Sequence, residues 1–313
     1  MFAIRCEGLT KRYRDVVALD GLDLAVGEHS VFGFLGPNGA GKTTTVKLLV
    51  GLSIPLSGKA WIAGQEVNPG AIELRNKIGY LPEVPTFYNW MSGLEFLFFI
   101  GELYHLLKEE IENRCNELLE LVELQEAAKR KIGSYSRGMR QRLGIAQALI
   151  NRPTIIFLDE PCSALDPIGR RDMLDLIQRL STNATVFMST HILSDVERVC
   201  DSVGIIDRGR LVITSSIEEL RRKYAHPVFE IEFEEEPSPF IPMLQSIRWL
   251  AKFEQVDSDG SPTLYLRVTD ISTAKKELPG IVAASGLTLL RYEINQPTLE
   301  DIFVQLVNGE AKK

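Results

Sequence analysis

Alternating apolar and polar residues predict strands at the start of the chain. Apolar side chains recur at every second position in Phe2–Glu7 and in Leu22–Val26, which is the period of a strand with one buried face. Ser30–Leu35 is an almost continuous apolar run and is typical of a strand buried on both faces. A helix is predicted from Lys42 to Val50, with Gly51 in the position of its C-terminal cap.

The stretch from about residue 85 to 150 is predicted to be mostly helical. Ser92 and Glu95 have the spacing of a capping box, and the apolar residues after them recur at helical intervals. A second helix is predicted over Glu109–Val122. This stretch is therefore expected to be a helical insertion.

Buried strands return after the helical stretch. Thr154–Leu158 and Thr185–Ser189 are predicted strands. Between them, Asp166 followed by Pro167 has the pattern of a helix start. Val203–Ile213 is predicted to form a hairpin. The order of elements predicts an α/β fold with antiparallel strands at its front.

The composition changes after a predicted helix over Ser216–Tyr224, and Pro227 marks a linker. The residues that follow predict strand, helix, strand, strand, helix and strand, which is the ferredoxin-like order. We therefore expect a domain over residues 1–224 and a small α+β domain over residues 225–313, with a regulatory or dimerisation role. The predicted strands of the second domain are Val228–Glu234, Leu250–Val256, Thr263–Val268 and Leu287–Ile294, and its predicted helices are Pro239–Ile247 and Ser272–Ala284.

Composition and charge restrict the class of protein. The chain has 313 residues, of which 45% are apolar and 25% charged, the balance of a globular protein long enough for two domains. Its net charge of -7 argues against a nucleic-acid binder that neutralises many phosphates. No run approaches the roughly 18 apolar residues of a spanning helix, and the first residues lack the layout of a signal peptide, so a cytoplasmic protein is expected. The four cysteines have no metal-ligand spacing.

A glycine-rich loop follows the third predicted strand and has the pattern G-x-x-x-x-G-K-[ST]. Glycines let backbone N–H groups surround a triphosphate, because side chains would block the approach. Lys42 supplies a cation for the outer phosphates, and the Thr43 hydroxyl is placed to bind Mg²⁺. The residues predicted to bind ATP here are Gly36, Pro37, Asn38, Gly39, Ala40, Gly41, Lys42, Thr43 and Thr44.

Two carboxylates follow the apolar strand Thr154–Leu158. Asp159 is predicted to hold Mg²⁺, and Glu160 to orient and deprotonate the attacking water. A helix or turn cap is the alternative role for Asp159. Together with the glycine-rich loop, the two carboxylates predict a P-loop NTPase.

The segment Tyr135–Arg142 resembles the signature of ABC ATPases, whose usual form is LSGGQ. The resemblance covers about residues 1–224 and implies a P-loop core of the ABC-ATPase type, with an antiparallel β subdomain and a helical insertion. Other motifs of the family stand in the same order: Tyr13 resembles the aromatic platform for adenine, Tyr80–Glu83 the Q-loop, Ser163–Asp166 the D-loop and His191 the switch histidine.

The resemblance implies a homodimer in the ATP-bound state, in which two such domains pack head to tail. The signature of one copy would then face the phosphate loop of the other, and His191 would act in catalysis as a sensor of the γ-phosphate and water. A lone histidine is otherwise usually structural. The residues expected to contact the partner's ATP are Ser136, Arg137, Gly138 and Asp166.

Two residues depart from the family pattern. Glu83 stands where most members have Gln, and its carboxylate is expected to bind Mg²⁺ while it adds negative charge near the phosphates. Arg137 replaces a glycine of the signature, and it either provides a cation to the partner's triphosphate or points to solvent. Because Ser136 and Gly138 are retained, the signature is expected to function.

The segment Gln296–Phe303 resembles the end of ATPases from ABC-2-type exporters, the drug, antibiotic and polysaccharide group. Thr298 and Asp301 also form a capping-box pattern for a last helix. The resemblance implies an ATPase on the cytoplasmic face of the cell membrane that drives a separate integral membrane permease. The permease is expected to dock near Glu83–Trp90, where aromatic residues cluster; packing is their alternative role.

Three other functions are compatible with a P-loop ATPase. These are the subunit of an importer, a soluble ABC ATPase that acts on DNA or ribosomes, and a regulatory subunit with little turnover. The acidic charge, and the lack of a long coiled-coil insertion or a second such domain, disfavour the DNA and ribosome function. The departures at Glu83 and Arg137 motivate the regulatory one.

Overall fold

The computed structural model describes residues 2–68, 70–163, 165–224, 228–258, 261–295, 299, 300, 302 and 303. The chain divides into two compact units, Met1–Ile217 and Glu218–Lys313. This division falls at the start of α8 (Ile217–Tyr224), whereas the predicted boundary falls at its end. The predicted linker residue Pro227 and the capping pair Thr298 and Asp301 lie outside the described residues.

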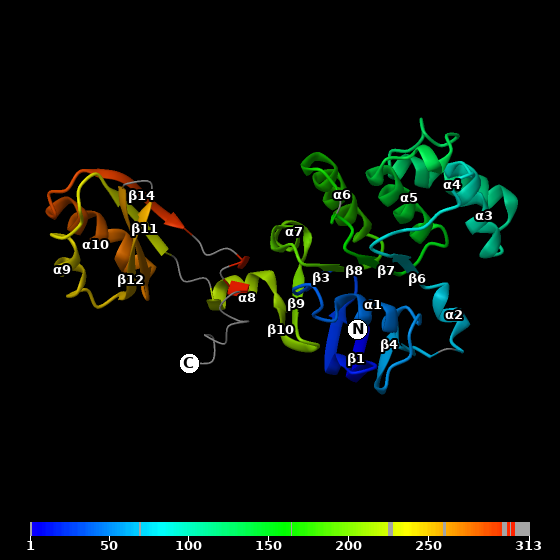
Figure 1. Ribbon diagram of the computed structural model, residues 1–313, viewed down its shortest axis with the longest axis horizontal. Helices are drawn as coiled ribbons and strands as arrows, with labels where there is room; N and C mark the ends of the chain where they lie inside the picture. The colour runs from blue at the N-terminus through cyan, green and yellow to red at the C-terminus, as the bar shows by residue number, and fades with distance from the viewer. Residues whose placement is uncertain are drawn as a thin grey trace. The chain divides into compact units, whose positions relative to one another are not determined.

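A six-stranded sheet forms the centre of the first unit (Figure 1). Its strand order is β10-β9-β3-β8-β7-β6, with parallel neighbours from β9 to β6 and an antiparallel edge strand β10. The predicted hairpin is thus confirmed as the pair β9 and β10. The strands are β3 (Val31–Leu35), β6 (Ile78–Leu81), β7 (Ile155–Asp159), β8 (Thr185–Thr190), β9 (Ser202–Asp207) and β10 (Arg210–Ser216).

Side chains of the central strands alternate between two apolar cores. On β7, Ile156 and Leu158 belong to the core shared with α5 (Arg137–Leu149) and α6 (Pro167–Leu180). Phe157, between them, belongs to the core shared with α1 (Lys42–Leu49). In Figure 1, α5 and α6 lie on one side of the sheet and α1 on the other. Because both faces are covered, β3, β7 and β8 are buried along their whole length, as their apolar runs predict.

A four-stranded antiparallel sheet, in the order β2-β1-β4-β5, covers the α1 side. Its first two strands are longer than predicted, because pairing continues through register shifts to the hairpin end. The prediction also missed two strands of this sheet, the strand β6 and two short helices. The antiparallel strands are β1 (Phe2–Tyr13), β2 (Val16–Gly27), β4 (Ser57–Ile62) and β5 (Gln65–Glu66), and the short helices are α2 (Ile72–Arg75) and α7 (Leu193–Val199).

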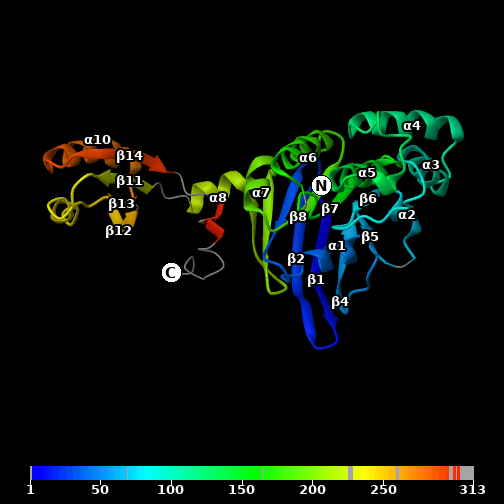
Figure 2. The same ribbon diagram turned by 45° about the horizontal axis from the view of Figure 1, so that its top comes forward.

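The helical insertion contains α3 (Gly93–Leu103), α4 (Lys108–Leu121) and α5, which gather beside β6 in Figures 1 and 2. The predicted capping box at the start of α3 is confirmed. The Ser92 backbone N–H donates to Glu95 Oε2 over 2.7 Å, and the Glu95 N–H donates to Ser92 Oγ over 3.2 Å. None of the helices in the described part of the chain has the length and apolarity needed to cross a bilayer.

The second unit contains a four-stranded sheet in the order β12-β13-β11-β14, with every neighbouring pair antiparallel. This strand order, with one helix after the first strand and one after the third, is the ferredoxin-like arrangement that the sequence predicts. The first helix is shorter than predicted. The elements are β11 (Val228–Phe233), α9 (Ile241–Leu244), β12 (Leu250–Ser258), β13 (Ser261–Val268), α10 (Ile271–Ala284) and β14 (Leu289–Asn295).

Phe187 lies at the centre of the first unit, fully buried, with its ring 5.3–5.5 Å from the rings of Phe32, Phe34 and Phe157. Phe187→Ala should lower the free energy of unfolding by about 3–5 kcal/mol, because it removes these contacts and leaves a cavity. Chemical denaturation measures the loss. Phe2→Ala is the control, because Phe2 is 57% exposed. Equal losses in the two variants would contradict this packing.

Candidate active site

Four strands bring the predicted site residues to one edge of the central sheet. The glycine-rich loop follows β3, Glu83 follows β6, Glu160 follows β7 and His191 follows β8. The carboxyl ends of parallel strands lie at the same edge, where ligands of α/β proteins bind. A pocket of about 370 Å³ opens there, lined by Val16, Ala18, Asn38, Gly39, Gly41, Lys42, Thr43, Thr44, Glu83, Glu160, Ser163 and His191.

The two outer glycines of the loop are required by close backbone contacts. A Cβ atom at Gly36 would lie 2.3 Å from the carbonyl oxygen of Ile206, and one at Gly41 would lie 2.6 Å from that of Ala18. Gly41 also has a φ of 111°, which side-chain-bearing residues rarely adopt. The glycine spacing that predicted a phosphate loop is therefore what this backbone needs in order to fold.

Lys42 is buried inside the loop, with 5% of its surface exposed. Its ammonium donates to the carbonyl oxygens of Gly36 and Pro37, over 2.8 and 3.2 Å. Its Nζ atom also lies 3.2 Å from Glu160 Oε1. The loop's own carbonyl groups thus fix the ammonium in the pocket, and the Glu160 carboxylate balances its charge.

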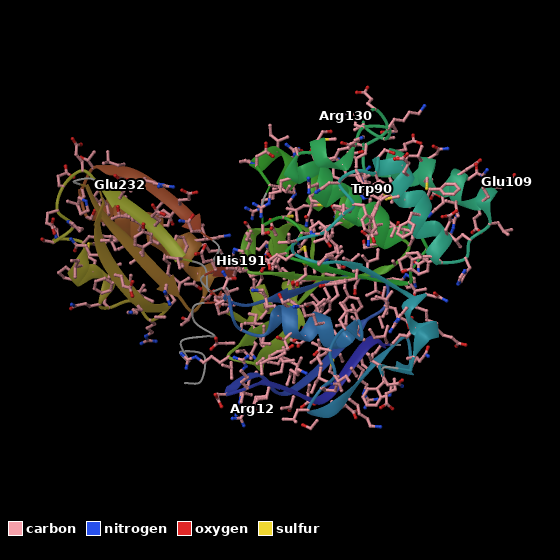
Figure 3. All side chains as sticks on the ribbon, turned by 45° about the vertical axis from the view of Figure 1, so that its right-hand side comes forward. Arg12, Trp90, Glu109, Arg130, His191 and Glu232 are labelled. Atoms are coloured by element: carbon pink, nitrogen blue, oxygen red, sulfur yellow. The ribbon has the colours of Figure 1, made fainter. Side chains whose placement is uncertain are left out.

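The Glu160 carboxylate lies between a lysine and a histidine. Its Oε1 atom faces Lys42, and its Oε2 atom is 2.9 Å from His191 Nδ1. The Glu160 backbone has a φ of 50° and donates its N–H to the carbonyl oxygen of Ser189 over 3.0 Å. The structure therefore brings together the two residues predicted to act in catalysis, from the ends of neighbouring strands; Figure 3 labels His191.

Asp159 is almost completely buried and accepts hydrogen bonds from two hydroxyl groups. Thr43 Oγ1 donates to Asp159 Oδ1 over 3.3 Å, and Ser189 Oγ donates to the same oxygen. Burial raises the pKa of the Asp159 carboxyl above its ordinary value, and these two hydrogen bonds oppose the change. Ser189 is not among the predicted site residues, because what marks it is its pairing opposite Asp159 in β8, a feature of the tertiary structure.

The oxygen donors around Asp159 fit a magnesium ion that is also bound by phosphates. Mg²⁺ prefers hard oxygen ligands and is usually held by one or two protein groups together with the substrate. The Thr43 hydroxyl and the Asp159 carboxylate are such donors, and Glu83 lines the same pocket. Across the described residues, no group of three or more His, Cys, Asp and Glu side chains could form a complete metal cage.

The hairpin between β1 and β2 forms another wall of the pocket. Tyr13, the predicted adenine platform, is 45% exposed and pairs with Val16, although Tyr13 itself is not among the lining residues. Val16 and Ala18 line the pocket because alternate residues of a strand point to the same side. Neither residue was predicted to line the site, because the strand was predicted only from Leu22 onward.

The residues predicted to contact a partner's ATP lie at the starts of two helices, outside the pocket lining, whereas Ser163 of the D-loop lines the pocket. Ser136 caps α5 by accepting the Met139 N–H over 3.2 Å, and the next residue, Arg137, is exposed. Asp166 caps α6 by accepting the Gly169 N–H over 2.9 Å. Their predicted contacts with a partner's ATP stay a prediction.

Comparison with known proteins identifies the family. Residues 19–163 match the model of the ABC transporter family. The uncharacterized ABC transporter ATP-binding protein YxlF of Bacillus subtilis is 38% identical over 306 residues, which cover 97% of this chain and 99% of that protein. The chain belongs to the ABC transporter ATP-binding proteins. The prediction of an ABC-type ATPase is therefore confirmed.

Other similarities of this ABC transporter ATP-binding protein cover both of its units. Residues 216–307 match the model of the C-terminal domain of DrrA1-3-like ATP-binding proteins. The bacitracin transport ATP-binding protein BcrA of Bacillus licheniformis is 36% identical over 98% of this chain and 97% of its own length. The daunorubicin resistance ATP-binding protein DrrA2 of Streptomyces coeruleorubidus is 33% identical over 100% and 98%.

Solved structures of ATP-binding cassettes confirm the fold class. An ATP-binding subunit of an ABC transporter superposes with a TM-score of 0.65 at 30% identity, over 71% of this chain and 93% of that one. The dimeric cassette MJ0796 bound to ADP and Pi superposes with a TM-score of 0.63 at 25% identity, over 68% and 98%. ATP binding and hydrolysis are thus activities of this ABC protein.

Lys42→Ala should weaken ATP binding by about 10- to 100-fold, the equivalent of one lost hydrogen bond to a charged group. The lost group is the buried ammonium that the loop carbonyls hold in the pocket. Titration of the full-length chain with a fluorescent ATP analogue measures the affinity. Lys47→Ala, on the exposed side of the same helix, is the control. Unchanged affinity in Lys42→Ala would contradict the assignment.

Proposed function

We propose that this chain hydrolyses Mg-ATP to power export through a separate membrane permease, as a homodimer peripheral on the cytoplasmic face of the cell membrane. The observation that carries the proposal is the Glu160 carboxylate, positioned between the Lys42 ammonium and the His191 imidazole in the pocket after β3. BcrA and DrrA2, which are similar over nearly the whole chain, are named for bacitracin transport and daunorubicin resistance, and these names support export.

The charges in the pocket favour release of Glu160 from Lys42 when ATP binds. Lys42 and Glu160 balance each other at 3.2 Å. A triphosphate carries more negative charge than one carboxylate, so it competes with Glu160 for the ammonium. Glu160 is then free to accept the proton of the attacking water, while His191 keeps its carboxylate oriented.

Thr43 and Asp159, with Glu83 from the Q-loop position, are the proposed holders of Mg²⁺. The ion supplies charge neutralisation at the phosphates. Asp159 is kept ready for this role by the hydroxyl groups of Thr43 and Ser189, which fix its Oδ1 atom.

A second copy completes the site in this proposal. Ser136, Arg137 and Gly138 begin α5 at the surface, where the backbone N–H groups of the first helical turn and the Arg137 cation favour an anion. Asp166 begins α6 in the same way, and its carboxylate already caps its own helix. These residues are proposed to contact the partner's ATP, and an Arg137 that points only to solvent is the alternative.

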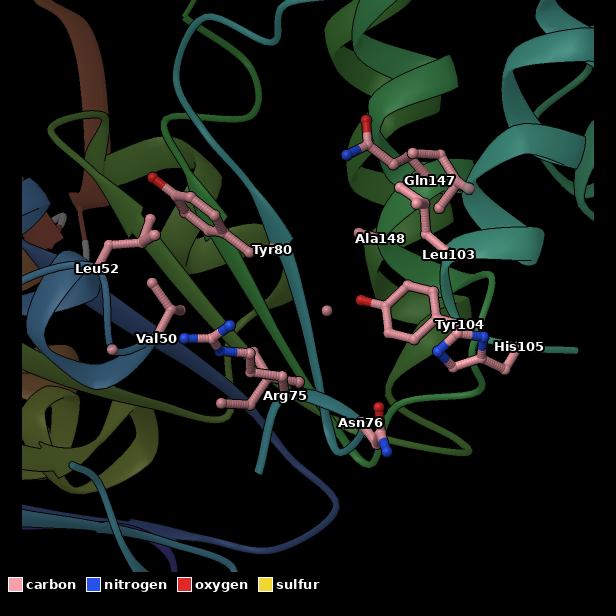
Figure 4. Close-up of a pocket in the computed structure, with 14 residues that line it drawn as sticks. Val50, Leu52, Arg75, Asn76, Tyr80, Leu103, Tyr104, His105, Gln147 and Ala148 are labelled. Carbon is pink, nitrogen blue, oxygen red and sulfur yellow. The ribbon is translucent and has the colours of Figure 1, made fainter. Parts of the chain in front are cut away.

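The permease is proposed to insert a helix into the cleft between the core and the helical insertion. A pocket of about 670 Å³ lies there. Figure 4 shows Leu52 and Tyr80 of the core on one side of it, and Leu103, Tyr104 and Gln147 of the insertion on the other. Apolar walls with a few polar groups suit the apolar face of an amphipathic helix.

The aromatic residues predicted to form this dock lie outside that pocket lining. Phe87 packs edge-on against Phe96, with ring centres 5.1 Å apart, so packing accounts for it. Tyr88 and Trp90 are exposed, and their ring centres lie 6.0 Å apart. Figure 3 labels Trp90 on the helical insertion. Glu83 lines the nucleotide pocket instead. The dock is therefore proposed at the cleft, with Tyr88 and Trp90 outside its lining.

Glu160→Gln should lower ATP turnover by about 10²- to 10⁴-fold, because an amide cannot accept the proton. ATP binding and ATP-induced dimerisation should be retained. Phosphate release and size-exclusion chromatography with ATP measure the two properties. Glu120→Gln, an exposed substitution on α4, is the control. Equal turnover in Glu160→Gln and the unchanged chain refutes the assignment of Glu160 as the residue that accepts the proton.

Leu103→Asp should abolish co-purification with an integral membrane protein, because it puts a charge into the apolar wall of the cleft. Basal ATPase activity should stay unchanged. Leu107→Asp is the matched control: it is also exposed on the insertion, lies outside the pocket lining and occupies a helix N-cap, where Asp is favoured. Recovery of no membrane protein with the unchanged chain would count against the permease proposal.

A further inference from the structure

Two loops of the site, the D-loop and the loop of the switch histidine, each lead into a helix. Asp166 caps α6, and Arg170 lies one turn further on, with its N–H bonded to the Asp166 carbonyl oxygen over 2.8 Å. His191 precedes α7, and Asp195 lies in the first turn of that helix. Arg170 lies four residues after Asp166, the N-cap of α6, and Asp195 lies four residues after His191 and three after Ile192, the N-cap of α7.

An ion pair joins these two first turns. Arg170 Nε lies 2.6 Å from Asp195 Oδ1, and the Arg170 guanidinium also donates to Ser194 Oγ over 2.9 Å. A planar guanidinium that bonds two neighbouring residues of one turn fixes its orientation as well as its distance. The contact therefore constrains the start of α7 relative to the start of α6.

Asp195 depends on Arg170 because it is buried. Its side chain is only 2% exposed, and within the described residues no donor reaches its second oxygen, Oδ2. Burial raises the pKa of the Asp195 carboxyl, and Arg170 is the largest influence that lowers it again. The cost of burying the charges of such an ion pair can exceed the free energy that the pairing gains, so the pair is weak evidence for a role in stability. The arrangement instead favours a role in positioning the two helices.

The pair also lies within electrostatic reach of the reacting groups. After burial and Arg170, the Glu160 charge raises the pKa of the Asp195 carboxyl and the His191 charge lowers it. Burial raises the pKa of the Cys162 thiol, and the charges of Asp195 and Arg170 act on this pKa in opposite directions. His191 lies two residues before α7, so a displacement of this helix would change the contact of His191 with Glu160. That contact joins His191 Nδ1 and Glu160 Oε2 over 2.9 Å.

We propose that Arg170 and Asp195 are positioning residues, whose ion pair clamps the first turns of α6 and α7 together and holds Asp166 and His191 in the arrangement that hydrolysis needs. The inference rests on the roles given to Asp166 and His191 in the proposed function. A displacement of about 1 Å at such groups is enough to slow a reaction by about 100-fold.

The same two helices provide a matched control. Arg198 of α7 and Asp175 of α6 form a second ion pair at 2.9 Å, further along both helices. Their side chains are 39% and 47% exposed, so this pair is solvated, whereas Asp195 of the first pair is buried. If any ion pair between α6 and α7 served equally well, removal of this one would have the same effect.

The experiment compares paired substitutions in the full-length chain. Arg170→Met alone leaves a buried carboxylate without its partner and should lower Tm. Arg170→Met with Asp195→Leu removes both charges and should restore Tm, because apolar replacements of a buried pair are often neutral or stabilising. We expect kcat of this double variant to stay about 10- to 100-fold low, with unchanged ATP affinity. Arg170→Lys should give an intermediate kcat, because the lysine ammonium keeps the positive charge but lacks the planar guanidinium that bonds both Asp195 and Ser194.

Three readouts decide the inference. Recovery of kcat together with Tm in the Arg170→Met/Asp195→Leu variant would overturn it, since the pair would then act only in folding. A fall in kcat of the same size in Arg198→Met/Asp175→Leu would also overturn it. His191→Ala separates this inference from the proposed function. If His191→Ala abolishes turnover while the Arg170 double variant is fully active, only the clamp is wrong; if His191→Ala is fully active, the role of His191 fails and the clamp fails with it.

Discussion

The placement of one buried ammonium group is the constraint on which the rest of the site depends. Lys42 is held by carbonyl oxygens of its own loop, and the backbone of this loop passes very close to β2 and β9 at the two outer glycines. A buried cation must have a counter-charge, and Glu160 provides it. The residue that would activate water is thus kept beside the residue that would bind phosphate.

This arrangement requires a rigid support, which the parallel sheet provides. β3, β7 and β8 are neighbours, are buried on both faces and end at one edge, so the loops that follow them start from fixed points. Phe187 packs against aromatic side chains of β3 and β7, which holds the strands in register. The hydroxyl of Ser189 then meets the carboxylate of Asp159 directly across β8 and β7.

Charged contacts extend this support from the sheet to the helices around it. Arg142 of α5 pairs with Asp172 of α6, and Arg170 of α6 pairs with Asp195 of α7. The helix that begins at the D-loop is therefore tied on one side to the signature helix and on the other to the helix after the switch histidine. In an ATPase whose site is proposed to be shared by two copies, such ties would let a contact at one loop affect the others.

The sequence by itself determined the local features of this protein. Glycine spacing, the apolar run of β3 and the capping box of α3 depend on residues a few positions apart, so the phosphate loop, both catalytic candidates and the ferredoxin-like order of the second unit were predictable. Only the tertiary structure decided which residues from distant segments meet. Val16, Ser189 and the pair of Arg170 with Asp195 carry no local pattern, because their contacts depend on strand order, register and helix packing. The cleft between core and insertion has the same origin, since its two walls come together only when α3 and α5 pack beside β6.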